Sequence, residues 1–407
     1  MTKEKVIPQI RFSGFTDTWE QRELGEVVKE VTRNDSTSEA PIMMITANNG
    51  FIEQSERYAF NNAGESLKKY ILLEKGELAY NHGASKLRPY GSCFALTTAE
   101  NARIPFVYHC FSVENQNAEF MSIELNSSEI ENQLRKIVSS GARMDGLLNI
   151  SFDEYSSVSV VLPSIEEQDR IAGFLRNLDR LITLHQRKYD KLTKVKKAML
   201  EKMFPENGSP YPEIRFKGFT DAWEQRKFSE LTEIRSASRV HKEEWQSSGV
   251  PFYRSSDVMA ALNGTENEKA FISEELYEKL SAVSGKLEKG DILVTGGGSV
   301  GKPYIVPNNE PLYTKDADLL WVKNNEKLVP YFIYTFFFSP AFSDYLNSVS
   351  HVGTIAHYTI TQLEETPITL PCVSEQQKIG DYFRNIDSLI TLHQRKLEKV
   401  IFAFISL

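Results

Sequence analysis

The sequence is poor in cysteine and has no long hydrophobic run. Its three cysteines, Cys93, Cys110 and Cys372, stand alone among 407 residues, and no pair has the CxxC spacing. This pattern argues against a disulfide framework and against a cysteine-rich zinc site, and it favours a reducing environment. The longest apolar run, YFIYTFFF at 331–338, is too short to cross a bilayer, and the first residues show no signal-peptide pattern. We therefore expect a cytoplasmic protein that does not associate with membranes.

Catalytic and metal-binding motifs are also missing. The sequence contains no GxSxG, no HExxH, no paired-carboxylate signature and no Asn/Asp-Pro-Pro-Tyr motif, and its seven histidines have no metal-ligand spacing. Segment 296–302 does satisfy both GxGxxG and GxxxxGK. Both fingerprints require a helix to begin at the last glycine, whereas 303–307 reads PYIVP and predicts a strand. We expect a chain that holds no metal or cofactor and catalyses no reaction alone.

Lysine and arginine are outnumbered by aspartate and glutamate, 47 to 55. The net charge is −8, and lysine and arginine are concentrated in 166–203. Because phosphate binding needs a cationic surface, this balance leans against nucleic acid as a partner. A DNA-binding function would require local basic patches, or partner proteins that supply phosphate contacts.

The chain does contain two internal repeats. LPSIEEQDRIAGFLRNLDRLITLHQRK at 162–188 returns at 370–396 with 16 of 27 positions identical and an offset of 208 residues. IRFSGFTDTWEQR at 10–22 returns at 214–226 with 11 of 13 identical and an offset of 204. The stretches between the repeats do not match. A constant frame therefore holds two variable modules.

Each long repeat predicts a helix with a heptad stripe of apolar residues, bracketed in the first copy by Pro163 and Pro205. Such narrow stripes are stable when two helices cover each other. If His185 and His393 face each other, an antiparallel pairing brings Glu375 near Met203, and we expect that arrangement. The histidines are interpreted as ordinary core residues rather than metal ligands or proton carriers. The residues expected at the interface are Ile171, Leu175, Leu178, Ile182, His185, Tyr189 and Leu192 in the first helix and Ile379, Phe383, Ile386, Ile390, His393, Leu397 and Val400 in the second.

The variable modules are rich in short β-type runs separated by Gly, Pro and Asn. Strands are expected at 41–46, 77–81, 92–97 and 104–110, and at 250–255, 291–295, 302–307 and 318–322. Helices are expected near 127–138 and 329–349, and each module should close on a polar-then-apolar strand, 148–163 and 358–371. The fold class expected is α+β with mostly antiparallel sheet: two pseudo-symmetric α/β domains separated by two long helices packed as an antiparallel coiled coil. The expected divisions are a first domain at 1–161, a spacer helix at 162–205, a second domain with its entry linker at 206–369, and a second spacer helix at 370–407.

Taken together, the repeats resemble the specificity subunits of type I DNA restriction–modification systems along essentially the whole chain. The residues that carry the resemblance are GFTDTWEQR and GFTDAWEQR, the KGEL and KGDI strand-and-turn segments, LP-x-x-x-EQ before each helix, RN-x-D-x-LIT-x-HQRK within it, and AMLEKMFP at the exit of the first. The resemblance implies two target recognition domains, each of which reads one half of a bipartite, asymmetric DNA sequence. It also implies that the helix pair sets the unread gap and docks two modification (methyltransferase) subunits.

The same resemblance implies restriction (motor and endonuclease) subunits in the full complex, with S-adenosylmethionine, ATP and Mg²⁺ bound by the partner subunits. Polar and cationic residues in turns are the candidates for base reading, since Arg and Lys suit guanine and Asn suits adenine. The DNA-binding candidates are Asn81, His82, Lys86, Arg88, Arg143, Arg254, Lys302, His351, His357 and Tyr358. Two alternatives remain open: a silent or variant specificity subunit with an altered C-terminus, and a coiled-coil protein–protein scaffold without a DNA role.

Overall fold

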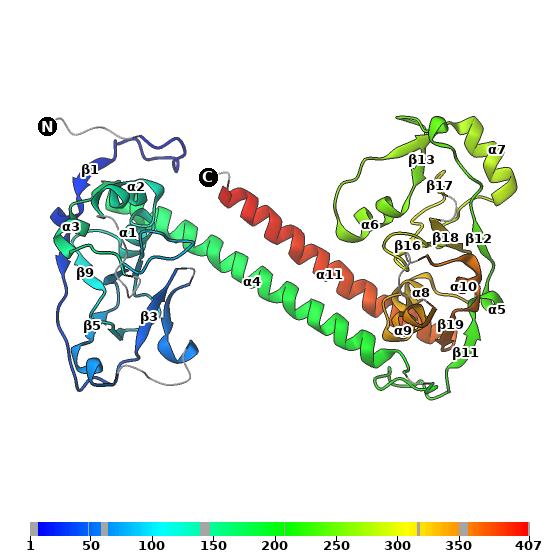
Figure 1. The fold of residues 1–407 in the computed structure, drawn as a ribbon, viewed down its shortest axis with the longest axis horizontal. Coiled ribbons are helices and arrows are strands. Elements are labelled where there is room, and N and C mark those ends of the chain that lie inside the picture. The colour runs from blue at the N-terminus through cyan, green and yellow to red at the C-terminus, as the bar shows by residue number, and fades with distance from the viewer. Residues whose placement is uncertain are drawn as a thin grey trace. The chain divides into compact units, whose positions relative to one another are not determined.

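The chain divides into two compact units, described separately below (Figure 1). The structure is a computed structural model that describes residues 7–47, 49–57, 64–138, 147–206, 208–315, 318–349 and 357–405. Unit 1 is formed mainly by residues up to Ile182, and unit 2 by Thr183–Ile401. The long helix α4 (Ile165–Met203) begins in the first unit and ends in the second.

Unit 1 is built of short antiparallel strands with small helices packed on them. Four strands form its largest sheet, in the order β2-β9-β6-β7. Two buried apolar clusters make its core, one of which includes Tyr80, Phe111 and Tyr155. The strands are β1 (Glu20–Glu23), β2 (Val28–Glu30), β3 (Met43–Thr46), β4 (Gly50–Glu53), β5 (Ile71–Glu74), β6 (Leu78–Asn81), β7 (Ser92–Ala95), β8 (Asn101–Ile104), β9 (His109–Val113) and β10 (Ser159–Leu162), and the helices are α1 (Ala118–Glu124), α2 (Ser128–Ile137) and α3 (Phe152–Ser156).

Unit 2 repeats this plan, although the residues between the repeats differ. Its largest sheet has four strands in the order β12-β18-β15-β16, all antiparallel. The strands are β11 (Glu224–Lys227), β12 (Ile234–Ser236), β13 (Val250–Tyr253), β14 (Ala270–Ile272), β15 (Ile292–Thr295), β16 (Pro303–Ile305), β17 (Tyr313–Thr314), β18 (Leu319–Val322) and β19 (Pro367–Leu370). The helices are α5 (Phe228–Leu231), α6 (Ser255–Asn263), α7 (Glu274–Ser284), α8 (Pro330–Phe336), α9 (Pro340–Val349), α10 (Ile360–Glu365) and α11 (Val373–Ile405).

The repeated segments form the same frame in each unit. The WEQR segment becomes an edge strand that pairs antiparallel with the strand before the long helix: β1 with β10 in unit 1, and β11 with β19 in unit 2. A buried glutamate in the first turn of the long helix receives two hydrogen bonds from an arginine of the other repeat, Arg11 to Glu167 and Arg215 to Glu375, all at 2.7 Å.

The glutamine after each of these glutamates ties the helix to its own unit. Gln168 donates to the Pro163 carbonyl at 2.9 Å and accepts from the Asn117 N–H at 3.0 Å. Gln376 donates to the Pro371 carbonyl at 3.0 Å and accepts from the Val329 N–H at 3.1 Å. The EQ pair therefore anchors the first turn of each helix to the rest of its unit.

The two long helices run antiparallel within unit 2. His185 meets His393, Lys196 forms an ion pair with Asp387 at 2.6 Å, and Phe204 contacts Phe383, so later residues of α4 meet earlier residues of α11. The predicted stripe on α11 changes from buried at Ile379, Phe383 and Ile386 to half-buried from Ile390 onward. The predicted stripe on α4 is half-buried throughout except at Leu178, which is buried. The expected α+β fold class with an antiparallel helix pair is confirmed.

Several expected elements differ from the structure. Segment 104–110 is not one strand, because residues 105–108 form a turn between β8 and β9. Segment 329–349 is two helices, α8 and α9, rather than one. The polar halves of 148–163 and 358–371 fold as the short helices α3 and α10, each opened by a capping box in which Ser151 or Thr359 bonds the third residue of the helix. These caps explain why polar residues precede each closing strand.

His185 and His393 face each other between the two helices, with their Nδ1 atoms 3.0 Å apart. One ring must donate to the other, so the pair holds a single proton between these two atoms. The pKa of His393 is lowered, first by burial and then by repulsion from His185, Lys188 and Lys396.

Acid should therefore weaken the helix pair. Since the pKa of His393 is lower in the folded chain than its usual 6.5, the unfolded chain binds more protons between these two values. The stabilisation that neutral His393 contributes is complete above its usual pKa of 6.5. This stabilisation is lost as the pH falls from that value towards the lowered pKa of the folded chain. We expect the urea midpoint of the full chain to fall between about pH 7.5 and pH 5.5, and to fall less in the His185→Gln/His393→Gln variant. If the urea midpoint falls equally in the unsubstituted chain and in the double variant, the acid sensitivity does not come from the His185–His393 pair.

Candidate nucleic-acid interface

In unit 1 the turn at 82–91 joins β6 to β7, the last two strands of the main sheet. Its backbone is closed by bonds between Ser85 and Arg88, whose N–H groups each donate to the other residue at 3.0 Å. Gly91 ends the turn with φ +82, and an alanine Cβ there would lie 2.6 Å from the Asn81 carbonyl oxygen. Glycine is therefore needed for the chain to re-enter the sheet.

Three of the candidate residues in this turn hold it in place. Asn81 donates to the Ile45 carbonyl at 3.1 Å and accepts from the Gly83 N–H at 2.9 Å, so both ends of its amide are engaged. His82 is only 5% exposed, and its two ring nitrogens lie 2.7 Å from the carbonyl oxygens of Leu148 and Val107. Arg88 donates from Nη1 to the Asn126 carbonyl at 2.9 Å. The burial of His82 does not support direct contact with a base.

The tip of the same turn is open to solvent. Lys86 is exposed, and Leu87 beside it is 61% exposed. This tip can present one cation and one apolar side chain to a ligand.

In unit 2 the turn at 296–302 joins β15 to β16, which occupy the same places in their sheet as β6 and β7. The Gly301 N–H donates to the Thr295 carbonyl at 2.7 Å, and the Lys302 N–H to the Thr295 hydroxyl at 2.8 Å. Gly301 has φ +76, and a Cβ there would lie 2.8 Å from the ring of Phe342. The two glycine-rich patterns are thus a hairpin turn, and β16 begins directly after Lys302, as the sequence predicted.

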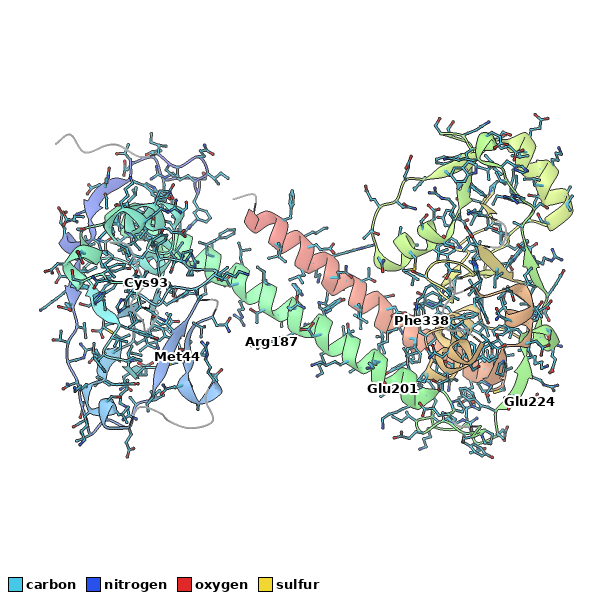
Figure 2. All side chains as sticks on the ribbon, viewed as in Figure 1. Met44, Cys93, Arg187, Glu201, Glu224 and Phe338 are labelled. Carbon is cyan, nitrogen blue, oxygen red and sulfur yellow. The ribbon has the colours of Figure 1, made fainter. Side chains whose placement is uncertain are left out.

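Of the candidates near this turn, two remain accessible. Lys302 is half-buried, with its ammonium 5.9 Å from the ring centre of Phe338, which Figure 2 labels. His357 is exposed, and its Nδ1 would lie 3.8 Å from a Cβ at Gly297. Both side chains therefore border the turn.

Tyr358 and Arg254 have structural contacts instead. Tyr358 is 1% exposed; its N–H donates to the Gly296 carbonyl at 2.8 Å, and its hydroxyl bonds Thr366. Arg254 donates from Nε to Asp257 at 3.0 Å and lies over the Trp245 ring at 5.4 Å. The burial of Tyr358 does not support base contact. Arg143 and His351 lie outside the described residues.

The described residues contain no group of three or more histidines, cysteines and carboxylates that could hold a metal ion, and no helix among them is long and apolar enough to span a bilayer. Burial raises the pKa of the Cys93 thiol to about 12, so this cysteine stays protonated and unreactive near neutral pH. Cys110 is buried as well, and burial raises its pKa further. The thiols of Cys93 and Cys110 therefore pack in the core and are not nucleophiles.

Sequence reasoning missed how these turns are supported. Asn126, which accepts from Arg88 and bonds both backbone groups of Cys93, has no sequence pattern that marks it. Arg11 and Arg215 could have been found, because both lie in the repeated IRF segment and face the repeated EQ segment.

The same segments match known proteins. Residues 16–194 and 220–401 each match the family model described as type I restriction modification DNA specificity domain. A curated relative, the specificity subunit of type I restriction enzyme MjaVIII from Methanocaldococcus jannaschii, is 23% identical over 290 residues. The match covers 69% of this chain but 65% of the relative, which is less than two thirds of its length. The crystal structure of a type I restriction–modification S subunit from M. genitalium has a similar fold, with a TM-score of 0.50, 13% identity, and coverage of 98% of this chain and 96% of that one.

Proposed function

Because this chain belongs to the family defined by the type I restriction–modification DNA specificity domain, we propose that it selects the DNA sequence on which a type I complex acts. Each unit reads one half of a bipartite, asymmetric target in double-stranded DNA. The helix pair sets the unread gap between the halves. The chain itself carries out no catalytic step.

One observation carries this proposal. The turns at 82–91 and 296–302 share a Gly and a Ser, at Gly83 and Ser85 and at Gly297 and Ser299, but differ in length and in most other residues. Both nevertheless join the last two strands of four-stranded sheets with the same strand order. The frame around each unit is repeated in sequence, with 16 of 27 and 11 of 13 positions identical, and it includes the bidentate pairs of Glu167 and Glu375. A constant frame that presents a variable turn at one fixed place suits a protein that reads two different sequences with one architecture.

Within each turn, the exposed and the bonded residues have different tasks. Lys86, Lys302 and His357 border the turns and can reach a base edge or a phosphate. Asn81, Arg88 and Arg254 each bond other groups of the protein, Arg88 through Nη1, so they hold the reading surface in shape. Arg143 and His351 stay candidates for base contact.

The partners follow from the same family. Two modification (methyltransferase) subunits dock on the helix pair, and restriction subunits join the full complex. S-adenosylmethionine, ATP and Mg²⁺ bind to those subunits rather than to this chain. The partners also supply much of the phosphate contact, which reconciles DNA binding with a net charge of −8. A cytoplasmic location, where the chain meets DNA, fits this assembly.

Methylation mapping tests the assignment directly. Cells that carry this chain together with its modification subunits should show one methylated, two-part DNA motif that is absent from cells without the chain. Exchange of the segment between the repeats of unit 1 should change only one half of the motif. If the methylated motif persists in cells from which the chain has been removed, the chain does not select that sequence. The coiled-coil scaffold without a DNA role would then be the remaining explanation.

Loss of a turn lysine should separate base reading from phosphate contact. A lysine that contacts a guanine edge contributes ~1–3 kcal/mol of discrimination. We therefore expect Lys86→Ala and Lys302→Ala to weaken binding of the assembled complex to its mapped target by roughly 5- to 150-fold. Binding to a scrambled sequence should change much less.

The matched controls are Lys136→Ala on α2 and Lys279→Ala on α7, two exposed lysines outside the turns. Equal losses on target and scrambled DNA would assign Lys86 or Lys302 to phosphate contact. No loss on either DNA would remove that lysine from the interface.

A further inference from the structure

Asn126 in unit 1 and Phe338 in unit 2 occupy corresponding places, between α1 and α2 in the first unit and between α8 and α9 in the second. Each lies nine residues after the residue whose N–H donates to the glutamine of the EQ pair, Asn117 in unit 1 and Val329 in unit 2. The two places are therefore fixed to the repeated frame at the same distance along the chain.

The backbone bonds at the two places are also alike. The Asn126 N–H donates to the carbonyl three residues before it at 3.2 Å, and the Phe338 N–H does the same at 3.0 Å. The next residue is a serine in both units, and its hydroxyl accepts from the N–H three residues further on, at 3.3 Å for Ser127 and 3.4 Å for Ser339. The residues on either side mostly differ between the units, so the fold, and not a repeated motif, makes the two places equivalent.

This place contacts a basic residue of the neighbouring turn in each unit. In unit 1 the Asn126 carbonyl accepts from Nη1 of Arg88, in the turn at 82–91, at 2.9 Å. In unit 2 the ammonium of Lys302, at the end of the turn at 296–302, lies 5.9 Å from the ring centre of Phe338. Two chemically different residues at one place therefore support the turn that each unit presents.

Other contacts hold the Phe338 ring beside its turn. The Tyr334 ring meets it edge-on, with 5.2 Å between the ring centres. The ammonium of Lys196, from α4, lies 5.1 Å from the same ring centre and forms an ion pair with Asp387 at 2.6 Å. Because Asp387 compensates the charge of Lys196, the repulsion between the two lysines is reduced. The ring can therefore attract the ammonium of Lys302 through its π electrons.

We propose that Phe338 is a positioning residue for DNA reading in unit 2, because its ring holds the ammonium of Lys302 in the place from which it contacts a base. This inference rests on the proposed function, since it requires Lys302 to contact DNA. A lysine side chain has many rotamers, and a contact that fixes one of them before DNA binds lowers the entropic cost of the base contact. Phe338 thus contributes to sequence specificity without touching a base.

Binding of the assembled complex to its mapped target tests this role with two substitutions. Phe338→Leu removes the aromatic face and should weaken binding by about 2- to 5-fold, as expected for an exposed cation–π contact. Binding to scrambled DNA should change much less. Phe338→Tyr keeps the aromatic face and should bind like the unsubstituted chain.

The matched control is Phe219→Leu, which removes a ring of the repeated frame that lies 5.0 Å from the ammonium of Lys378. It should leave binding to both DNA sequences unchanged. A loss with Phe219→Leu that equals the loss with Phe338→Leu would overturn the proposal, because any lost cation–π contact would then have the same effect. Circular dichroism and the urea midpoint of each full chain verify that the variants are folded.

A double variant separates positioning from packing. In the Lys302→Ala chain, Phe338→Leu should cause no further loss on the target, because the ring no longer has an ammonium to hold. A loss that persists in this background, or an equal loss on scrambled DNA, means that Phe338 only packs, and it overturns the proposal.

The single variants distinguish this inference from the proposed function. A loss with Lys302→Ala but none with Phe338→Leu overturns the role of Phe338 and leaves the reading by Lys302 in place. If Lys302→Ala itself leaves target binding unchanged, Lys302 does not read the target, and the role of Phe338 fails with it.

Discussion

Replacement of Glu375 by alanine should lower the free energy of unfolding by about 3 kcal/mol, because it leaves a buried cation without its partner. The Glu375 side chain is 0% exposed and that of Arg215 is 14% exposed, and two hydrogen bonds of 2.7 Å join them. These bonds raise the pKa of the Arg215 guanidinium above its usual value. The guanidinium also stays charged without Glu375, because its usual pKa already lies far above neutral pH. The pair also joins the N-terminal edge of unit 2 to α11, so its loss should loosen the frame.

Urea denaturation of the full chain measures this effect. The matched control is Glu224→Ala, which removes a 70%-exposed carboxylate paired with Arg226. Surface pairs of this kind contribute about 0–1 kcal/mol. The double variant Arg215→Met/Glu375→Ala should recover part of the loss, because no charge is left buried. A loss with Glu375→Ala that is no larger than the control loss would mean that solvent reaches the pair.

The second large effect is expected at Phe204. Its side chain is 2% exposed and contacts Trp223, Phe332 and Phe383. Phe204→Ala should lower the free energy of unfolding by about 3–5 kcal/mol, since it removes the ring and leaves a cavity that rigid neighbours cannot fill. It should also expose Trp223, which would shift the tryptophan fluorescence of unit 2 to longer wavelength.

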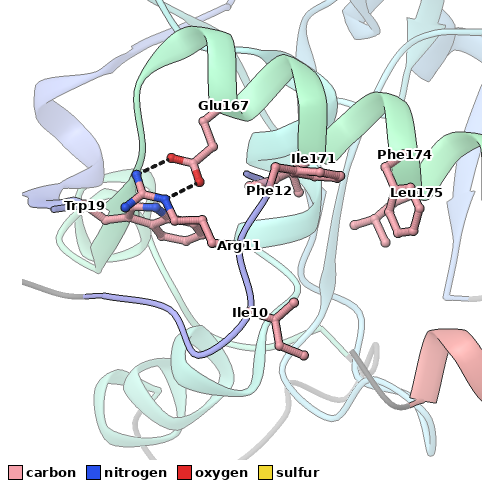
Figure 3. A pocket seen from close by; sticks show the side chains of 8 residues that line it. All are labelled: Ile10, Arg11, Phe12, Trp19, Glu167, Ile171, Phe174 and Leu175. Atoms are coloured by element: carbon pink, nitrogen blue, oxygen red, sulfur yellow. Dashed lines mark hydrogen bonds and ion pairs between the residues drawn. The ribbon is translucent and has the colours of Figure 1, made fainter. Parts of the chain in front are cut away.

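Phe174→Ala is the control, because this residue is 37% exposed and borders an open cavity of unit 1, shown in Figure 3. The eight residues that line this cavity have counterparts in unit 2, six of them identical in type, and there Phe204 fills the corresponding site by packing against two of them, Trp223 and Phe383. Loss of the Phe174 ring should change the urea midpoint much less. If both substitutions cost the same, the filled site in unit 2 and the open cavity in unit 1 would be energetically alike, contrary to their difference in burial.

The repeats in the sequence were sufficient to predict the frame of this protein. Both halves of each contact in the frame lie within repeated segments, so Arg11 with Glu167 and Arg215 with Glu375 form wherever those segments recur. The heptad stripe likewise predicted the two long helices, because helix periodicity is a local property of the chain. The antiparallel direction followed from the assumption that His185 faces His393, and the structure confirms that contact. The hairpin at 296–302 was recognisable from Pro303, which rules out the helix that a phosphate-binding loop needs.

Other features were decided only by tertiary structure. Apart from the KGEL and KGDI strand-and-turn stretches, the segments between the repeats share little sequence. Both nevertheless form a four-stranded sheet of the same order, because strand order depends on pairing between distant residues. All four of His82, Tyr358, Lys86 and His357 look like polar turn residues in the sequence. Contacts between distant parts of the chain bury His82 and Tyr358 and leave Lys86 and His357 exposed. Eight nearly identical residues line one filled site and one open cavity, and only the packing of the α4 end shows which is which. Local periodicity therefore determined the helices and the frame, whereas long-range packing decided which side chains a ligand can reach.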